Sequence, residues 1–165
     1  MKRALSVVAA SVALPAPWMA AAQVPPVEAG YAFDKPRVLA QQLVWGRLHG
    51  VRLLAQACRE RGDGDTMAVY VEWLESQSST IAAAERTLSL HYFGRGPVPM
   101  EAIDAALKLK PALDLTEDEL AAGCATLPAA LAQPRNDLRR YYVDLRTAIE
   151  RGHGDLRAVG GSEGP

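Results

Sequence analysis

The sequence predicts an all-α protein in which a long antiparallel helical hairpin and several shorter helices form a bundle, held by one disulfide. Apolar residues recur three and four positions apart through most of the chain, which is the spacing of one helix face. No segment shows the apolar–polar alternation of a half-buried strand, and none repeats at the spacing of a solenoid. The two cysteines of the chain, Cys58 and Cys124, can form this disulfide.

The first 22 residues have the pattern of a secretory signal peptide. Two basic residues are followed by an apolar run over residues 4–14 and by small residues at 20–22, the order of regions that precedes a cleavage site. The run of about 11 residues is too short to span a bilayer, which takes roughly 20. Two prolines after the run argue against a buried N-terminal helix. We therefore expect cleavage near Ala22.

This interpretation divides the chain into a signal peptide (1–22), a helical bundle domain (23–152) and a glycine-rich, disordered tail (153–165). Cleavage would remove Lys2 and Arg3 and change the formal net charge from −1 to −3. Such a chain offers no positive surface for nucleic acid or anionic lipid, and we expect no stable membrane span. The predicted location is the periplasm or the exterior of a bacterial cell.

An even pair of cysteines in an oxidising compartment predicts a disulfide between Cys58 and Cys124. Closing a loop of roughly 65 residues would stabilise the fold by about 4 kcal/mol. The alternative is a pair of thiols active in redox chemistry. Such pairs usually have C-x-x-C spacing, which the chain lacks.

The first long helix is expected to be capped by Asp34, to carry Pro36 in its first turn and to end at Gly62. Its predicted apolar face consists of Leu39, Val44, Leu48, Val51, Ala55 and Cys58. Asp63 or Asp65 can cap the second long helix, which is expected to end at Gly94. Its predicted stripe consists of Met67, Val71, Leu74, Ile81, Ala84 and Leu88.

Shorter helices are expected after Gly94. One is predicted over residues 99–109, and Thr116 with Glu119 forms a capping box that opens another. We expect Pro128 to interrupt and restart that segment, Pro134 to open the last helix, and Gly152 to end it.

The chain carries no motif of a known catalytic or cofactor site: no haem attachment sequence, zinc protease motif, hydrolase nucleophile elbow or phosphate-binding loop. We therefore expect a protein that is not an enzyme and needs no cofactor or metal. In an antiparallel hairpin, His49 and His91 would lie roughly 22 Å apart along the helices, too far to share a metal ion.

A hairpin that turns near residues 62–63 would place His49 opposite Gln77 and Ser78. Buried polar groups need partners, so these three side chains could form a polar layer in which each satisfies the others. The alternative is a ligand pocket between the long helices. Its lining would consist of Trp45, His49, Trp73, Gln77 and Ser78.

The last helix carries a candidate partner face, formed by Arg139, Arg140, Tyr141 and Tyr142. Tyrosine and arginine are enriched at the energetic centres of protein interfaces. The alternative is an ordinary solvated helix face on which arginine stems cover apolar surface.

These observations predict an exported, non-enzymatic helical protein that acts through contact with another envelope or secreted protein. An accessory subunit, a chaperone or an immunity or inhibitor protein would fit. The alternative is a periplasmic module that binds a small ligand or metal in the polar pocket between the long helices.

Overall fold

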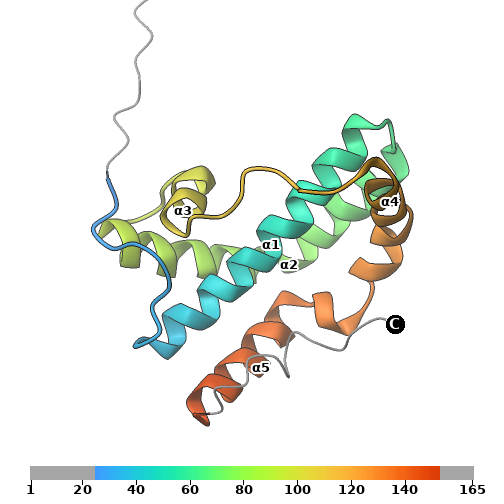
Figure 1. Cartoon of the computed structure of the whole chain (residues 1–165). Helices are drawn as coiled ribbons and strands as arrows, with labels where there is room; N and C mark the ends of the chain where they lie inside the picture. Colours follow the sequence, from blue (N-terminus) through green and yellow to red (C-terminus); the bar gives the residue numbers. More distant parts are fainter. Residues whose placement is uncertain (1–24, 153–165) are drawn as a thin grey trace, which may run out of the picture.

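A computed structural model describes residues 25–152, which form five α-helices and one 3₁₀ turn and contain no strand (Figure 1). The all-α prediction is confirmed. The predicted signal peptide and tail, and His153, lie outside the described residues. Within those residues, no helix has an apolar stretch long enough to cross a bilayer.

Helix α1 (Pro36–Glu60) begins one residue later than expected. Its N-cap is Lys35, whose side chain makes no capping hydrogen bond, and Asp34 is not the cap. The residue before a proline is held in an extended conformation, so Lys35 takes the boundary position and Pro36 the first helical one. The predicted apolar face is otherwise buried, apart from Val51, which is half-buried.

Helix α2 (Gly64–Phe93) starts and ends as expected. The Asp63 carboxylate accepts a hydrogen bond from the Thr66 backbone N–H at 2.9 Å, and Gly94 ends the helix with a φ of 64°. The predicted stripe is only partly right, because Val71 is exposed while Tyr70 and Trp73 are buried. Helix α2 packs against α4 and α5 as well as α1, so its buried face is not the one that a two-helix hairpin would require.

Three further helices complete the bundle: α3 (Met100–Ala106), α4 (Glu117–Leu131) and α5 (Leu138–Glu150). The Thr116–Glu119 capping box of α4 forms as expected. Pro128 does not interrupt α4, however, and lies inside its last turn. A proline there removes one N–H bond near a helix end, while Leu127 and Leu131 on either side remain buried.

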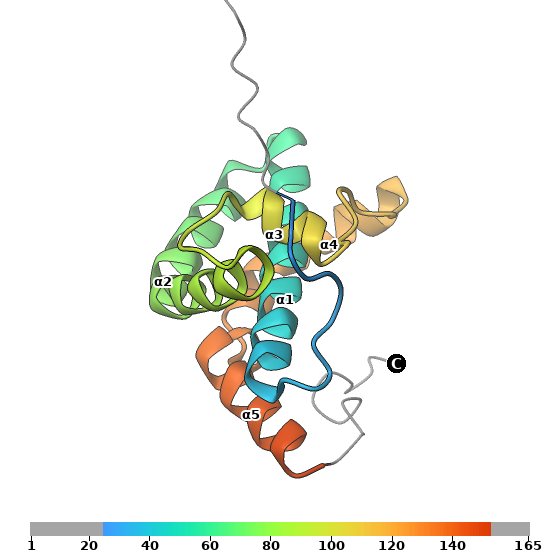
Figure 2. The same ribbon diagram turned by 90° about the vertical axis from the view of Figure 1, so that its left-hand side faces the viewer.

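A further correction concerns Pro134, which opens a short 3₁₀ turn, η1 (Pro134–Asn136), and not the last helix. Asp137 caps α5 by accepting a hydrogen bond from the Arg140 N–H at 3.0 Å. Figures 1 and 2 show α5 beside the first half of α1, whereas α4 lies beside the turn between α1 and α2.

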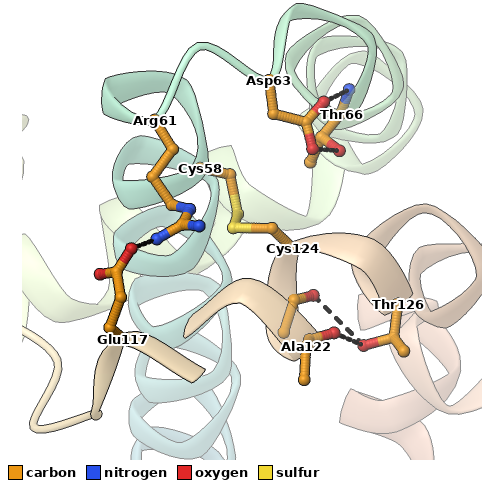
Figure 3. Close-up of a disulfide and its surroundings, with 9 residues drawn as sticks. Cys58, Arg61, Asp63, Thr66, Glu117, Ala122, Cys124 and Thr126 are labelled. Carbon is orange, nitrogen blue, oxygen red and sulfur yellow. Dashed lines mark hydrogen bonds and ion pairs between the residues drawn. A yellow bond between two sulfur atoms is a disulfide. The ribbon is translucent and has the colours of Figure 1, made fainter. Parts of the chain in front are cut away.

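The predicted disulfide is confirmed. Cys58 near the end of α1 is bonded to Cys124 of α4, with their Cα atoms 5.5 Å apart. Figure 3 shows the bond next to an ion pair between Arg61 and Glu117, which joins the same two segments. The disulfide therefore fixes α4 to the end of the hairpin where α1 turns into α2.

A neutral polar cluster fixes the segment before α1. The Tyr92 hydroxyl donates to the Gly30 carbonyl at 2.7 Å and accepts from Gln42 Nε2 at 2.5 Å. Gln42 also accepts from the Ala32 N–H at 2.9 Å. Burial raises the pKa of Tyr92 to about 12, although the hydrogen bond from Gln42 acts in the opposite direction.

Candidate functional site

The first candidate is a buried charged cluster between α1 and α3. Trp45, His49 and Arg52 recur along one face of α1 and converge on Asp104 of α3. Asp104 accepts from Trp45 Nε1 at 2.8 Å and from the Arg52 guanidinium. Its other neighbour is His49 Nδ1, at 3.2 Å.

The imidazole of His49 links this cluster to the segment after α3. Its Nε2 lies 2.7 Å from the Lys110 carbonyl oxygen, which can only accept, so Nε2 carries the proton. Its Nδ1 lies 2.9 Å from the Arg52 guanidinium and 3.2 Å from the Asp104 carboxylate. Both ring nitrogens are thus engaged within the protein, which leaves no nitrogen for a substrate.

The predicted polar layer of His49, Gln77 and Ser78 is wrong. Gln77 Oε1 accepts from the Leu138 N–H at 2.8 Å, and its Nε2 donates to Ser76 Oγ at 2.9 Å. Ser78 is exposed. The polar groups of the predicted pocket residues do not come together, because they have partners in different parts of the bundle.

Trp73 illustrates that separation. Its Nε1 donates to the Asn136 carbonyl at 2.9 Å, beside the start of α5, whereas Trp45 donates to Asp104 in α3. The expectation treated the hairpin as two isolated helices. In the folded protein Trp45 and His49 have partners in α3 and the segment after it. Trp73 and Gln77 have theirs in η1 and at the start of α5.

The remaining histidine of the described segment, His91, lies in the last turn of α2. Burial and the charge of Lys35 lower the pKa of His91, and the carboxylates of Glu28 and Asp34 partly oppose this shift. Within residues 25–152 no three histidine, cysteine or acidic side chains are arranged to hold a metal ion.

The second candidate is the predicted partner face on α5. The Arg47 guanidinium of α1 lies over the Tyr141 ring, 4.1 Å from its centroid. Arg47 also donates to the Arg135 carbonyl at 3.0 Å and to Asn136 Oδ1 at 3.2 Å. Three contacts therefore hold this side chain, and Tyr141 beneath it is half-buried.

The rest of this face is open to solvent. Arg139 and Arg140 are exposed, and Tyr142 is half-buried. Val143 is 54% exposed, one of the few large apolar side chains in the described residues with this much free surface. Arg140 pairs weakly with Asp144 at 3.9 Å.

A cavity that sequence reasoning missed lies at the other end of the bundle. It has a volume of about 220 Å³ and lies between α1, the segment after α3 and the start of α4. Its lining is mostly apolar, and its two polar side chains, Gln56 and Glu60, come from α1. The complete lining consists of Leu53, Gln56, Ala57, Glu60, Pro111, Ala112, Leu113, Leu115 and Leu120. The leucines at 113, 115 and 120 were a possible signal, because they recur in a proline-containing segment too short to bury them.

Comparisons with known proteins found no matching family model, no similar curated protein and no similar solved structure.

Proposed function

We propose that this chain is an exported, non-enzymatic helical protein of the periplasm or cell exterior that acts by binding another protein through the open face of α5. The observation that carries the proposal is the fixed Arg47–Tyr141 pair beside exposed arginines and an exposed valine. Tyrosine and arginine dominate the energetic centres of protein interfaces. Side chains already held in one conformation lose less entropy when they bind.

Charge distribution supports the same face. Residues 134–152 carry five arginines and three acidic side chains, whereas residues 25–133 carry ten basic and fourteen acidic side chains. The region around α5 is therefore positive on an otherwise negative molecule. Such asymmetry accelerates encounter with an acidic surface and orients it.

Site-specific photo-crosslinking in the native cell tests the proposal. A crosslinker at Val143 should capture one protein reproducibly, and a crosslinker at exposed Val71 on α2 should not. Arg139→Glu should reduce the captured amount at least several-fold, whereas Arg86→Glu, the same charge change on α2, should leave it unchanged. Equal capture from both positions, or no sensitivity to Arg139→Glu, would overturn the proposal.

Export is tested separately by the mass and N-terminal sequence of the protein recovered from the periplasm or medium. The mature chain should begin at or near Gln23. Recovery of the full-length chain from the cytoplasm would contradict the proposed location.

A further inference from the structure

The open face of α5 presents an apolar side chain among positive charges. On a helix the neighbours of Val143 are the residues three and four positions away, which include Arg139, Arg140 and Arg146. All three arginines are exposed, as is Val143. Arg140 and Arg146 pair with Asp144 and Glu150 of the same helix at 3.9 and 3.1 Å, and Arg139 has no ion-pair partner among the described residues. This surface would fit a site with an apolar floor and a negative rim.

The cavity between α1 and α4 has that character. Leu53, Leu113 and Leu120 contribute to its apolar lining, and Leu115 at its edge is 46% exposed. Glu60 lines the same cavity from α1. With a volume of about 220 Å³, the cavity can hold a valine side chain together with the aliphatic stem of a neighbouring arginine.

The segments that surround the cavity are acidic. Residues 53–65 and 110–120 together carry seven acidic and three basic side chains. Glu60 and Asp118 are exposed and have no ion-pair partner among the described residues. The negative and positive regions of the molecule therefore each include exposed apolar surface.

These two regions cannot meet within one molecule. Figures 1 and 2 show α5 beside the first half of α1. The cavity is lined by residues 53–60 at the other end of α1, where Cys58 is bonded to Cys124. The complement of each surface is thus available only on another molecule.

We propose that this cavity is the docking site for α5 of a second copy of this chain. Val143 of one copy enters the cavity of the next, and its flanking arginines face Glu60 and Asp118. Because the two contacting surfaces differ, the contact is heterologous and builds a ring or an open chain of subunits. This inference rests on the proposed role of α5 as a binding face, and names a second copy as its partner.

The contact is expected to depend strongly on salt. Most of the charges involved are exposed, and the Debye length falls from about 30 Å at 0.01 M to about 3 Å at 1 M salt. Sedimentation of the mature protein from about 1 μM to about 1 mM, the range of weak and moderate affinities, should show mass rising with concentration at low salt. High salt should return the protein toward the monomer.

Two variants and their mixture give the decisive result. Val143→Glu removes the inserted side chain and Leu115→Glu damages the cavity edge, so each variant alone should stay monomeric. An equimolar mixture retains one intact face of each kind and should form a heterodimer that grows no further. Leu90→Glu, at an exposed apolar position on α2, is the matched control and should associate like the unmodified protein. Circular dichroism verifies that each variant is folded.

Several outcomes would overturn the inference: a monomer at every concentration in low salt, association that neither variant reduces, or an equal loss with Leu90→Glu. A monomeric protein that is still crosslinked through Val143 to a different protein would refute self-docking while leaving the proposed function intact. A protein that stays monomeric and is also not crosslinked through Val143 to any protein would refute both proposals.

Discussion

Two groups of arginine and aromatic side chains begin on α1 and have opposite surroundings. Trp45 and Arg52 point to α3, where Asp104 accepts from both. Arg47 points to α5 and lies over Tyr141, with a backbone carbonyl and an amide oxygen as its other partners. The first group is enclosed by α3 and the segment that follows it, and the second lies at the edge of an open surface.

The difference shows that residue type alone does not distinguish an enclosed cluster from an open surface. The Asp104 carboxylate pairs with Arg52 and accepts from Trp45, and His49 Nδ1 lies beside it. Arg47 keeps its positive charge beside an exposed helix face. A neighbouring carboxylate therefore makes the first group self-contained, whereas the second keeps a positive charge at the open surface that we propose as the binding face.

Asp104→Ala is expected to have the largest effect on stability, because it leaves the Arg52 charge partly buried without its partner. We expect the free energy of unfolding to fall by about 3 kcal/mol, the lower end for broken buried pairs, since Arg52 is 24% exposed. Urea denaturation measures this change. Asp118→Ala, at an exposed carboxylate in α4, should cost less than about 0.5 kcal/mol. Equal losses of unfolding free energy in both variants would show that Asp104 does not compensate a partly buried charge on Arg52.

His49→Leu on α1 and Gln77→Leu on α2 test whether the two side chains depend on each other. Each removes a hydrogen-bond partner from a backbone group, Lys110 carbonyl or Leu138 N–H, and should cost about 1–3 kcal/mol. The two side chains share no partner, so the double variant should lose the sum within about 0.5 kcal/mol. A double variant more stable than this sum would restore the polar layer that the structure rules out.

The Tyr92 cluster contains only neutral groups, and ionisation of Tyr92 at alkaline pH should disrupt it. Burial favours the neutral phenol in the folded state, so its stabilising contribution is complete below pH 10 and is lost as the pH rises from 10 to about 12. Tyr92→Phe should cost only about 1 kcal/mol at neutral pH, because Gln42 still donates to the Gly30 carbonyl.

The difference in stability between Tyr92→Phe and the unmodified protein should shrink over the same alkaline interval. Chemical denaturation at several pH values measures that difference. A constant difference from pH 8 to pH 12 would contradict the assignment.

Arg47→Ala should have the smallest effect on stability and a larger one on binding. A cation–π contact at a partly exposed site contributes about 0.5–1 kcal/mol, and the hydrogen bonds to η1 can be replaced by water. Crosslinking at Val143 should nevertheless weaken, because Tyr141 is no longer held. Arg47→Lys keeps the charge but loses the planar contact, so its crosslinking yield should lie between those of Arg47→Ala and the unmodified protein. A loss of stability as large as that of Asp104→Ala would make the open face structural.

Much of the local structure could be predicted because its signals lie within a few residues of one another. The Asp63 cap, the Thr116–Glu119 box and the stop at Gly94 each depend on backbone groups at most four positions away. Asp34 is not the cap because Pro36 constrains Lys35, the residue before it, to an extended conformation. The prediction gave more weight to the capping preference of aspartate than to this local constraint.

The sites were less predictable, because their partners are distant in sequence. Asp104 is 59 residues from Trp45 and 52 from Arg52, and Gln77 is 61 residues from Leu138. Pairing positions across the hairpin turn assumed that α1 and α2 face only each other. His49 and Gln77 instead bond to the segment after α3 and to the start of α5, and Ser78 is exposed.

The sequence by itself determined the all-α class, the two long helices and the cysteine pair, because helical periodicity, capping chemistry and cysteine number are local or compositional properties. Only the tertiary structure decided that His49 and Arg52 join Asp104, that Arg47 covers Tyr141, and that a cavity lies beside α4. The physical reason is that burial and charge compensation depend on which surfaces meet. Those surfaces are brought together only when α3, α4 and α5 pack onto the hairpin.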